Sequence, residues 1–449
     1  MMNKKNNWKQ KLHLEPLKGW LNDPNGLCFF KGIYHVYFQY SPDDAYGKGK
    51  KCWGHFKSTD FIKWDFTGAV LYPDNPDDRS GVYSGCALPC DDKIYLFYTG
   101  NVKEEGDFDY ITEGRKANII MVTTPDGEKM SEKTTLLKNA DYPAFCSCHV
   151  RDPKVYEENG KYKMVLGART LSGKGCVLFY VSENLTKWQF EKEVNIMDFG
   201  FMWECPDVLC FGDNKYLSVS PQGLPHEDYR FQNVYSSGYF KYEADALKDY
   251  SEWDYGFDFY APQTFKAQDG RTIMIGWMGI GDIPYKNPTA EKGRQHCLTL
   301  PREISEREDG VLLQQPVREL KKLRGEKRQL KKDCVNIGLP FELYGKTKGD
   351  FKIKFCDYLT LCYADGIFSL EFSDKTVGGG RTVRRTKLSE CKDIRVIADT
   401  SSLEIFLNGG EKVLSTRFYP ENTEVTLTAC SFECELYGLR EMEINYDKE

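Results

Sequence analysis

The hydrophobic and polar positions of the chain repeat a two-strand pattern five times. Each copy has a turn or an acidic start, an apolar-rich stretch, a polar turn and a second apolar stretch. Alternating stretches around a short polar turn predict an antiparallel β-hairpin. A second pattern also repeats, because STDFIKW at 58–64 resembles SENLTKW at 182–188. The five copies lie at 26–38, 85–100, 152–167, 207–219 and 260–277, and their starts are 59, 67, 55 and 53 residues apart.

The length of these copies indicates how the hairpins assemble. Each copy leaves room for four short strands, and one such sheet cannot bury both of its faces, whereas sheets packed radially can. The predicted fold class is therefore all-β, with an N-terminal five-bladed β-propeller domain over residues 1–315. A β-sandwich gives similar local strands, but repeats of this length fit blades better.

The pattern of hydrophobic and charged residues changes after the fifth copy. The charged stretch at 317–330 predicts a short amphipathic helix with a solvated Lys/Arg face, within a linker at 316–332. Further on, strand-like stretches at 402–407 and 412–418 flank an Asn-Gly-Gly turn and predict a hairpin. We expect a C-terminal β-sandwich over 333–449.

Composition and net charge restrict the kinds of partner and the location expected for this protein. The formal charge of −6 and the pI of about 5.8 argue against nucleic acid or an anionic membrane as the main partner. No run of about 18 apolar residues predicts a membrane helix. The 16 cysteines are too sparse for a disulfide scaffold, and the N-terminal residues lack the apolar core of a secretory signal, so we expect a reducing, cytoplasmic location. Cys146, Cys148 and His149 form the only dense thiol and imidazole cluster, without a second pair at zinc-site spacing, and we expect no metal and no cofactor.

Carboxylates stand at or just before the start of three copies. Asp23 precedes the first copy, Asp152 opens the third beside Arg151, and Glu204 opens the fourth. One Asp-Pro pair is an ordinary turn, but acids at equivalent repeat positions converge on one end of a propeller channel. Two carboxylates across a glycosidic bond, one an acid and one a nucleophile or base, hydrolyse glycosides. Aromatic residues interleave with these acids and offer flat faces to a sugar: Trp20, Tyr46, Trp53, Tyr83, Trp203 and Trp277.

These motifs, taken in order, resemble glycoside hydrolase family 32, the invertase, sucrose-6-phosphate hydrolase and fructanase family. The stretch at 399–408 resembles the C-terminal sandwich of that family, so the resemblance covers nearly the whole chain. The matching motifs lie at 20–26, 38–39, 53–55, 84–87, 151–153, 204–207, 258–265, 276–278 and 300–303.

The resemblance implies a role for each acid. Asp23 is expected to be the nucleophile, Glu204 the general acid/base, and Asp152 a transition-state stabiliser that holds fructose hydroxyls, with Arg151 orienting the acids. The reaction would be a retaining double displacement through a fructosyl-enzyme intermediate. The expected substrate-binding residues are Asn22, Gln39, Tyr46, Trp53, Tyr83, Ser84, Arg151 and Trp277.

One loop departs from the family pattern. Tyr46 stands where relatives usually carry a Trp, in a loop about two residues longer than usual, which bears on the stacking surface and the preferred leaving group. Lys48, Lys50 and Lys51 in this loop are candidates for contact with a sugar phosphate, and a solvated basic turn is the alternative.

The function expected from the sequence is a β-fructofuranosidase that hydrolyses sucrose, sucrose 6-phosphate or short fructo-oligosaccharides. Exo-acting fructan hydrolysis or fructosyl transfer within the same family is the alternative. An inverting arabinan- or xylan-type hydrolase and a noncatalytic sugar-binding propeller are weaker readings. The expected partner is a small sugar, and the sequence sets no oligomeric state.

Overall fold

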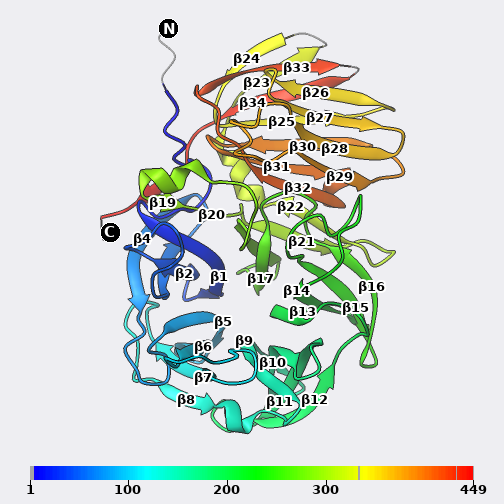
Figure 1. Cartoon of the computed structure of the whole chain (residues 1–449). Coiled ribbons are helices and arrows are strands. Elements are labelled where there is room, and N and C mark those ends of the chain that lie inside the picture. Colours follow the sequence, from blue (N-terminus) through cyan, green and yellow to red (C-terminus); the bar gives the residue numbers. More distant parts are fainter. Residues whose placement is uncertain (1–4, 332–333, 431, 448–449) are drawn as a thin grey trace.

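The computed structural model describes residues 5–331, 334–430 and 432–447, and its regular structure is almost entirely β (Figure 1). No helix in these ranges has the length and apolarity that a membrane span requires. Each hairpin expected from the sequence is an antiparallel pair in the structure. The prediction of an all-β chain is therefore confirmed.

The N-terminal part consists of five sheets, each beginning with one of these hairpins. The first sheet contains β1 (Gly19–Phe30), β2 (Ile33–Ser41), β3 (Cys52–Ser58) and β4 (Lys63–Leu71), and the second contains β5 (Gly81–Cys90), β6 (Lys93–Lys103), β7 (Arg115–Thr124) and β8 (Thr134–Leu137). The third contains β9 (Cys146–Glu158), β10 (Lys161–Thr170), β11 (Gly175–Ser182) and β12 (Gln189–Val194), and the fourth contains β13 (Met202–Phe211), β14 (Asn214–Gln222), β15 (Gly238–Glu243) and β16 (Ala246–Glu252). The fifth contains β17 (Tyr260–Lys266), β18 (Thr272–Met278), β20 (Cys297–Leu298), β21 (Arg302–Glu306) and β22 (Leu312–Pro316).

The first strands of these sheets contact one another in a closed ring. β1 contacts β5, β5 contacts β9, β9 contacts β13, β13 contacts β17, and β17 contacts β1 again. Figure 1 shows the sheets arranged around the space that these strands surround. Residues near the start of the first strands are therefore brought to one place, although they are far apart in the sequence.

The two heptapeptides that resemble each other form the same turn in two different sheets. Between β3 and β4 the Asp60 carboxylate accepts the backbone N–H groups of Ile62 and Lys63, and the Trp64 indole donates to the Phe61 carbonyl. Between β11 and β12 the side chains of Asn184 and Trp188 make the corresponding bonds. The repeat in sequence is thus a repeat in structure.

The C-terminal part consists of two six-stranded antiparallel sheets around one apolar core. Of the charged stretch at 317–330, only η3 (Arg318–Leu323) is helical, and the following residues form β23, whose backbone pairs with β34. One sheet contains β23 (Arg324–Lys331), β25 (Phe341–Lys346), β30 (Asp393–Ala398), β31 (Ser402–Leu407), β32 (Lys412–Arg417) and β34 (Glu433–Leu439). The other contains β24 (Cys334–Gly338), β26 (Phe351–Phe355), β27 (Leu359–Ala364), β28 (Ile367–Phe372), β29 (Val383–Lys387) and β33 (Glu424–Cys430). The remaining short elements are η1 (Asn139–Asp141), η2 (Pro288–Lys292), η4 (Asn408–Gly410), β19 (Arg294–Gln295) on β1, and β35 (Glu443–Asn445) on β4.

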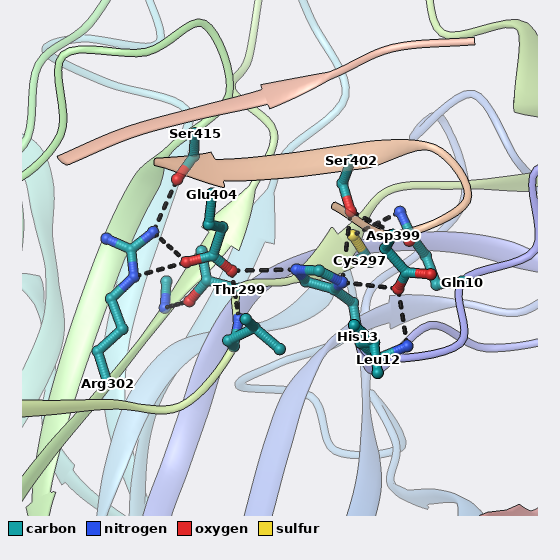
Figure 2. A network of polar contacts seen from close by, with 12 residues as sticks. Gln10, Leu12, His13, Cys297, Thr299, Arg302, Asp399, Ser402, Glu404 and Ser415 are labelled. Atoms are coloured by element: carbon teal, nitrogen blue, oxygen red, sulfur yellow. Dashed lines mark hydrogen bonds and ion pairs between the residues drawn. The ribbon is translucent and has the colours of Figure 1, made fainter. Parts of the chain in front are cut away.

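A buried polar network joins the two parts (Figure 2). His13 lies between two carboxylates, with Nδ1 2.9 Å from Asp399 and Nε2 3.0 Å from Glu404. Arg302 of β21 donates through Nε to Glu404 over 2.8 Å and through Nη2 to Ser415 over 2.7 Å. Burial lowers the pKa of His13, but its hydrogen bonds to Asp399 and Glu404 outweigh burial and raise that pKa to about 9. The imidazolium is therefore the form that this interface holds at neutral pH.

Candidate active site

Every first strand slips in register over an equivalent four-residue window. The first strand advances three residues while its partner advances two, which is the signature of a β-bulge. Proline lacks the N–H needed for a ladder bond and is found at bulges, and Pro24, Pro153, Pro206 and Pro262 lie inside four of the windows. Bulges redirect side chains at the end of a strand, so these windows aim their residues at a common place. The windows are 21–24, 82–85, 151–154, 204–207 and 260–263.

The three predicted carboxylates come together there. Cys205, at φ +46°, links two of them, because its Sγ lies 3.8 Å from Oδ2 of Asp23 and 3.7 Å from Oδ2 of Asp152. The backbone N–H of Cys205 also donates to Asp152 over 3.0 Å. Asp23 and Glu204 are close enough that the charge of Glu204 raises the pKa of Asp23.

Asp23 lies among hydrogen-bond donors. Ser84 donates through Oγ to Oδ2 over 2.5 Å, and Asn22 donates to Oδ1 over 3.2 Å. Gln39 bridges these neighbours, since its Oε1 accepts from Asn22 and its Nε2 donates to Ser84. Burial raises the pKa of Asp23, the hydrogen bonds from Ser84 and Asn22 act in the opposite direction, and the net pKa is raised.

Glu204 is held by three other side chains. Arg151 donates to Oε1 through Nε at 3.1 Å and Nη2 at 2.8 Å, while Gln222 and Tyr260 donate to Oε2 at 2.6 and 2.7 Å. Each carboxylate oxygen therefore has a donor, and the carboxylate is fixed in one orientation. Gln222 and Tyr260 were not among the residues expected from the sequence, although Tyr260 begins its Tyr-Ala-Pro window as Glu204 begins Glu-Cys-Pro.

Asp152 differs from the other two acids in how deeply it is enclosed. It is 5% exposed and has a left-handed backbone at φ +62°. Burial raises its pKa, Arg151 acts against this, the charges of Glu204 and Asp23 add to it, and the net pKa is about 7. Asp23 and Asp152 thus both bind a proton more readily than an exposed aspartate does.

The aromatic candidates divide into two groups. Trp277 lies beside Trp20 and Tyr260, with ring centroids 6.0 and 6.4 Å away, at the edge of the carboxylate cluster. Trp53 is completely buried and donates its indole N–H to the carbonyl of Tyr83, so it supports the backbone at Tyr83.

The loop at 42–51 carries another aromatic candidate, Tyr46. Its side chain is 60% exposed, and its backbone N–H donates to the carboxylate of Asp44. Lys48 and Lys50 are exposed. Lys51 is held, because Nζ donates to Ser41 and to the carbonyl of Gly47 and lies 5.3 Å from the Trp20 ring. The structure thus brings Lys51 to the site margin and leaves the other two lysines in solvent.

Within the described residues, no group of three or more His, Cys, Asp and Glu side chains is arranged to hold a metal ion. Asp23 accepts hydrogen bonds from Ser84 and Asn22, and Glu204 is held by Arg151. This pair of carboxylates is suited to attack on a glycosidic carbon with proton transfer to the leaving oxygen.

Comparison with known proteins identifies the family. Residues 13–316 match the family described as Glycosyl hydrolases family 32 N-terminal domain, and residues 368–437 match Glycosyl hydrolases family 32 C terminal. The chain belongs to glycosyl hydrolase family 32. The resemblance seen in the sequence motifs is confirmed, and the protein is a glycoside hydrolase.

Similar family 32 proteins span nearly the same length. The chain is 38% identical to a sucrose-6-phosphate hydrolase of Bacillus subtilis, over 94% of this chain and 91% of that protein. It is 36% identical to a raffinose invertase of Escherichia coli, over 93% and 90%. Among solved structures, a sucrose-6-phosphate hydrolase of Lactobacillus gasseri has a TM-score of 0.88 at 25% identity, covering 97% and 94%. A GH32 β-fructofuranosidase of Bombyx mori has a TM-score of 0.85 at 27% identity, covering 98% and 95%.

Proposed function

We propose that this protein is a retaining β-fructofuranosidase acting on sucrose, sucrose 6-phosphate or short fructo-oligosaccharides. The observation that carries the proposal is the convergence of Asp23, Asp152 and Glu204 from three different sheets, with separate donor sets on Asp23 and Glu204. The names of its family 32 relatives support the same substrates.

The first step forms a fructosyl-enzyme ester. A carboxylate oxygen of Asp23 attacks the anomeric carbon of the fructosyl unit, the bond from that carbon to the glycosidic oxygen breaks, and Glu204 donates its proton to the departing oxygen. Asp152 lies beside both and holds the fructosyl hydroxyls. The developing positive charge on the ring is stabilised by the surrounding carboxylates.

The second step releases fructose. Glu204, now ionised, takes a proton from water, the water oxygen attacks the anomeric carbon, and the bond to Asp23 breaks. Both acids return to their starting forms, and the anomeric configuration is retained after two inversions. Asn22, Gln39, Ser84, Arg151 and Trp277 bind the sugar, with Tyr46 and Tyr83 as aromatic contributors, and the buried Trp53 supports Tyr83 through its indole N–H.

The domains follow from the same proposal. The proposed domains are a five-bladed propeller over 1–315, a linker at 316–332 and a β-sandwich over 333–449 that supports the propeller, and the sandwich also includes β23 from the end of the linker. The cysteines whose side chains are described are free thiols, which fits a reducing cytoplasm. The partner is a small sugar, and neither a nucleic acid nor a membrane is proposed.

The test is a substrate panel of sucrose, sucrose 6-phosphate, kestose and inulin, with hydrolysis separated from transfer products. We expect fast release of fructose from the two small substrates. The anomer first released, followed by NMR before mutarotation, should keep the β configuration. Release of the inverted anomer would contradict the double displacement, and faster cleavage of inulin or dominant transfer would favour the alternatives within the family.

A further inference from the structure

A cluster of arginines lies beside Glu204, and only one of them, Arg151, hydrogen-bonds to that acid. The guanidinium of Arg151 bonds to Glu204 through Nε and Nη2, and its Nη1 donates to Nδ1 of His149 over 2.7 Å. His149 is therefore on the far edge of Arg151 from the acid. Burial, together with the charges of Arg151, Arg115 and Arg169, lowers the pKa of His149 to about 3, so the imidazole is neutral and three arginines lie around it.

The sheet register explains why Arg169 lies there. Gly167 of β10 pairs with Arg151 of β9, and side chains two residues apart on a strand lie on the same face. Arg169 and His149 therefore share the face on which Arg151 lies. Arg115 arrives from the start of β7, in the neighbouring sheet.

Arg115 and Arg169 have no acidic partner. In the ranges that the structure describes, neither guanidinium forms an ion pair, and the Nε–H of each is buried without a hydrogen bond. The Cζ atom of Arg169 lies over the Phe201 ring, 4.8 Å from the ring centroid. Asp109, on the turn above Cys148, is occupied by bonds from Ile111 and Thr112. Unpaired buried donors of charged groups are costly, so an anion that accepts hydrogen bonds from these two guanidinium groups would be stabilised there.

The lysines of the loop at 42–51 are placed differently. Lys51 has its donors bound to Ser41 and Gly47, and Lys48 and Lys50 lie in solvent. A solvated lysine gains less from an anion than an arginine pair with buried unpaired donors.

We propose that Arg115 and Arg169 bind the phosphate of a phosphorylated leaving group and so select sucrose 6-phosphate over sucrose. The inference rests on the proposed function, in which Glu204 protonates the glycosidic oxygen and the groups around it face the departing glucosyl unit. That unit carries the phosphate in sucrose 6-phosphate. The guanidinium fork matches the oxygens of a phosphate in pairs, which gives geometric selection as well as charge.

The experiment compares kcat/KM for sucrose and sucrose 6-phosphate in the wild type, Arg115→Gln, Arg169→Gln and the double variant. We expect each single change to lower kcat/KM for sucrose 6-phosphate by about tenfold and the double change by about 100-fold, with sucrose changing by less than about threefold. Arg115→Lys and Arg169→Lys keep the charge without the fork and should retain part of the preference. Circular dichroism and Tm of each variant verify folding, and the lysine variants keep the test decisive if a glutamine variant does not fold.

The matched control is Lys48→Gln with Lys50→Gln, which removes two exposed cations from the other loop and should leave the preference unchanged. Equal losses of kcat/KM on both substrates in the arginine variants would overturn the inference. So would a preference for sucrose 6-phosphate that is lost only in the control with Lys48→Gln and Lys50→Gln. A wild-type enzyme that cleaves the two substrates equally well would also overturn it while leaving the proposed function intact. Failure of the wild type on both substrates would instead reject the proposed function.

Inhibition separates a sugar phosphate from free phosphate as the anion recognised. Glucose 6-phosphate should inhibit sucrose hydrolysis more strongly than glucose in the wild type and no more strongly than glucose in the double variant. Inorganic phosphate at the same concentration should inhibit less than glucose 6-phosphate. Stronger inhibition by inorganic phosphate would mean that the cluster binds the free anion, and the inference would fail.

Discussion

The groups around Asp23 shift its pKa in opposite directions. Burial and the charge of Glu204 raise its pKa, whereas hydrogen bonds from Ser84 and Asn22 favour the carboxylate. In the proposed mechanism the ionised form attacks the anomeric carbon. We therefore expect the donors around Asp23 to set how far into the acidic range the enzyme remains active.

Replacement of Ser84 tests this balance. Ser84→Ala removes a 2.5 Å hydrogen bond to the ionised form of Asp23, so the pKa of Asp23 rises further. The acidic limb of the kcat/KM profile should then move to higher pH by about one unit. The measurement is kcat/KM for sucrose from pH 4 to 8, with the exposed Ser131→Ala as control. An acidic limb that does not move would show that Ser84 does not tune Asp23.

Loss of either reacting acid should abolish turnover. Asp23→Ala removes the attacking oxygen and Glu204→Ala removes the proton donor, so each should lower kcat at least about 10³-fold while the fold remains. Initial rates on sucrose give the effect, and circular dichroism verifies folding. Asp92→Ala and Glu183→Ala, both exposed, are the matched controls and should retain full activity. A near-native rate in either active-site variant would refute the assignment.

At the scale of elements, the bulges place the site. Arg151 and Glu204 lie on neighbouring first strands, β9 and β13, and Gly167 of β10 pairs with Arg151 and lies against the backbone of Trp203. An added Cβ on Gly167 would lie 2.1 Å from the carbonyl oxygen of Trp203. The absence of a side chain at this position lets β10 approach β13 closely enough for the ion pair of Arg151 and Glu204.

Gly167→Ala should therefore move the two strands apart. We expect a loss of about 1–3 kcal/mol in the free energy of unfolding and a lower kcat, because the backbone oxygen of Trp203 cannot rotate away as a side chain would. Urea unfolding and sucrose kinetics measure the two effects. Gly438→Ala is the control, since an added Cβ there meets nothing within 4 Å, and it should be neutral. A neutral Gly167→Ala variant would contradict the close approach.

At the scale of the whole molecule, buried charges join the N-terminal and C-terminal parts. Besides the His13 network, Arg381 bonds to Asp258 through two nitrogens, at 2.8 and 2.6 Å, and all of these groups are buried. Separation of the two parts would leave charges without partners, which is strongly unfavourable. We therefore expect the chain to unfold as one unit.

The protonated state of His13 makes that unit sensitive to pH. Its pKa is raised in the folded state from 6.5 to about 9, so its stabilising contribution is complete below pH 6.5 and is lost as the pH rises through 9. The wild type should lose about 3 kcal/mol of unfolding free energy over this window. His13→Gln should be less stable at pH 6 and lack this loss. Urea unfolding of the wild type and of His13→Gln at pH 6 and 10 measures this loss. An equal pH dependence of the two unfolding free energies would contradict the role of His13.

Local sequence pattern is enough to predict the strand pairs, and the motifs are enough to predict the family. Alternation around polar turns is a local property, so all five hairpins could be predicted, as could the shared turns ending at Trp64 and Trp188. The motif resemblance likewise points to the family from sequence alone. The helix expected at 317–330 was only partly formed, because β34 offered a strand partner that local pattern cannot reveal.

Tertiary structure alone decided which side chains meet. Gln222, Tyr260 and Cys205 join the acids because bulges on separate sheets converge, and no spacing along the chain encodes the distances between sheets. The same convergence leaves Arg115 and Arg169 without acidic partners beside Glu204. Hydrophobic alternation specifies each sheet, whereas packing between sheets sets burial, charge pairing and therefore the proton affinities of the site.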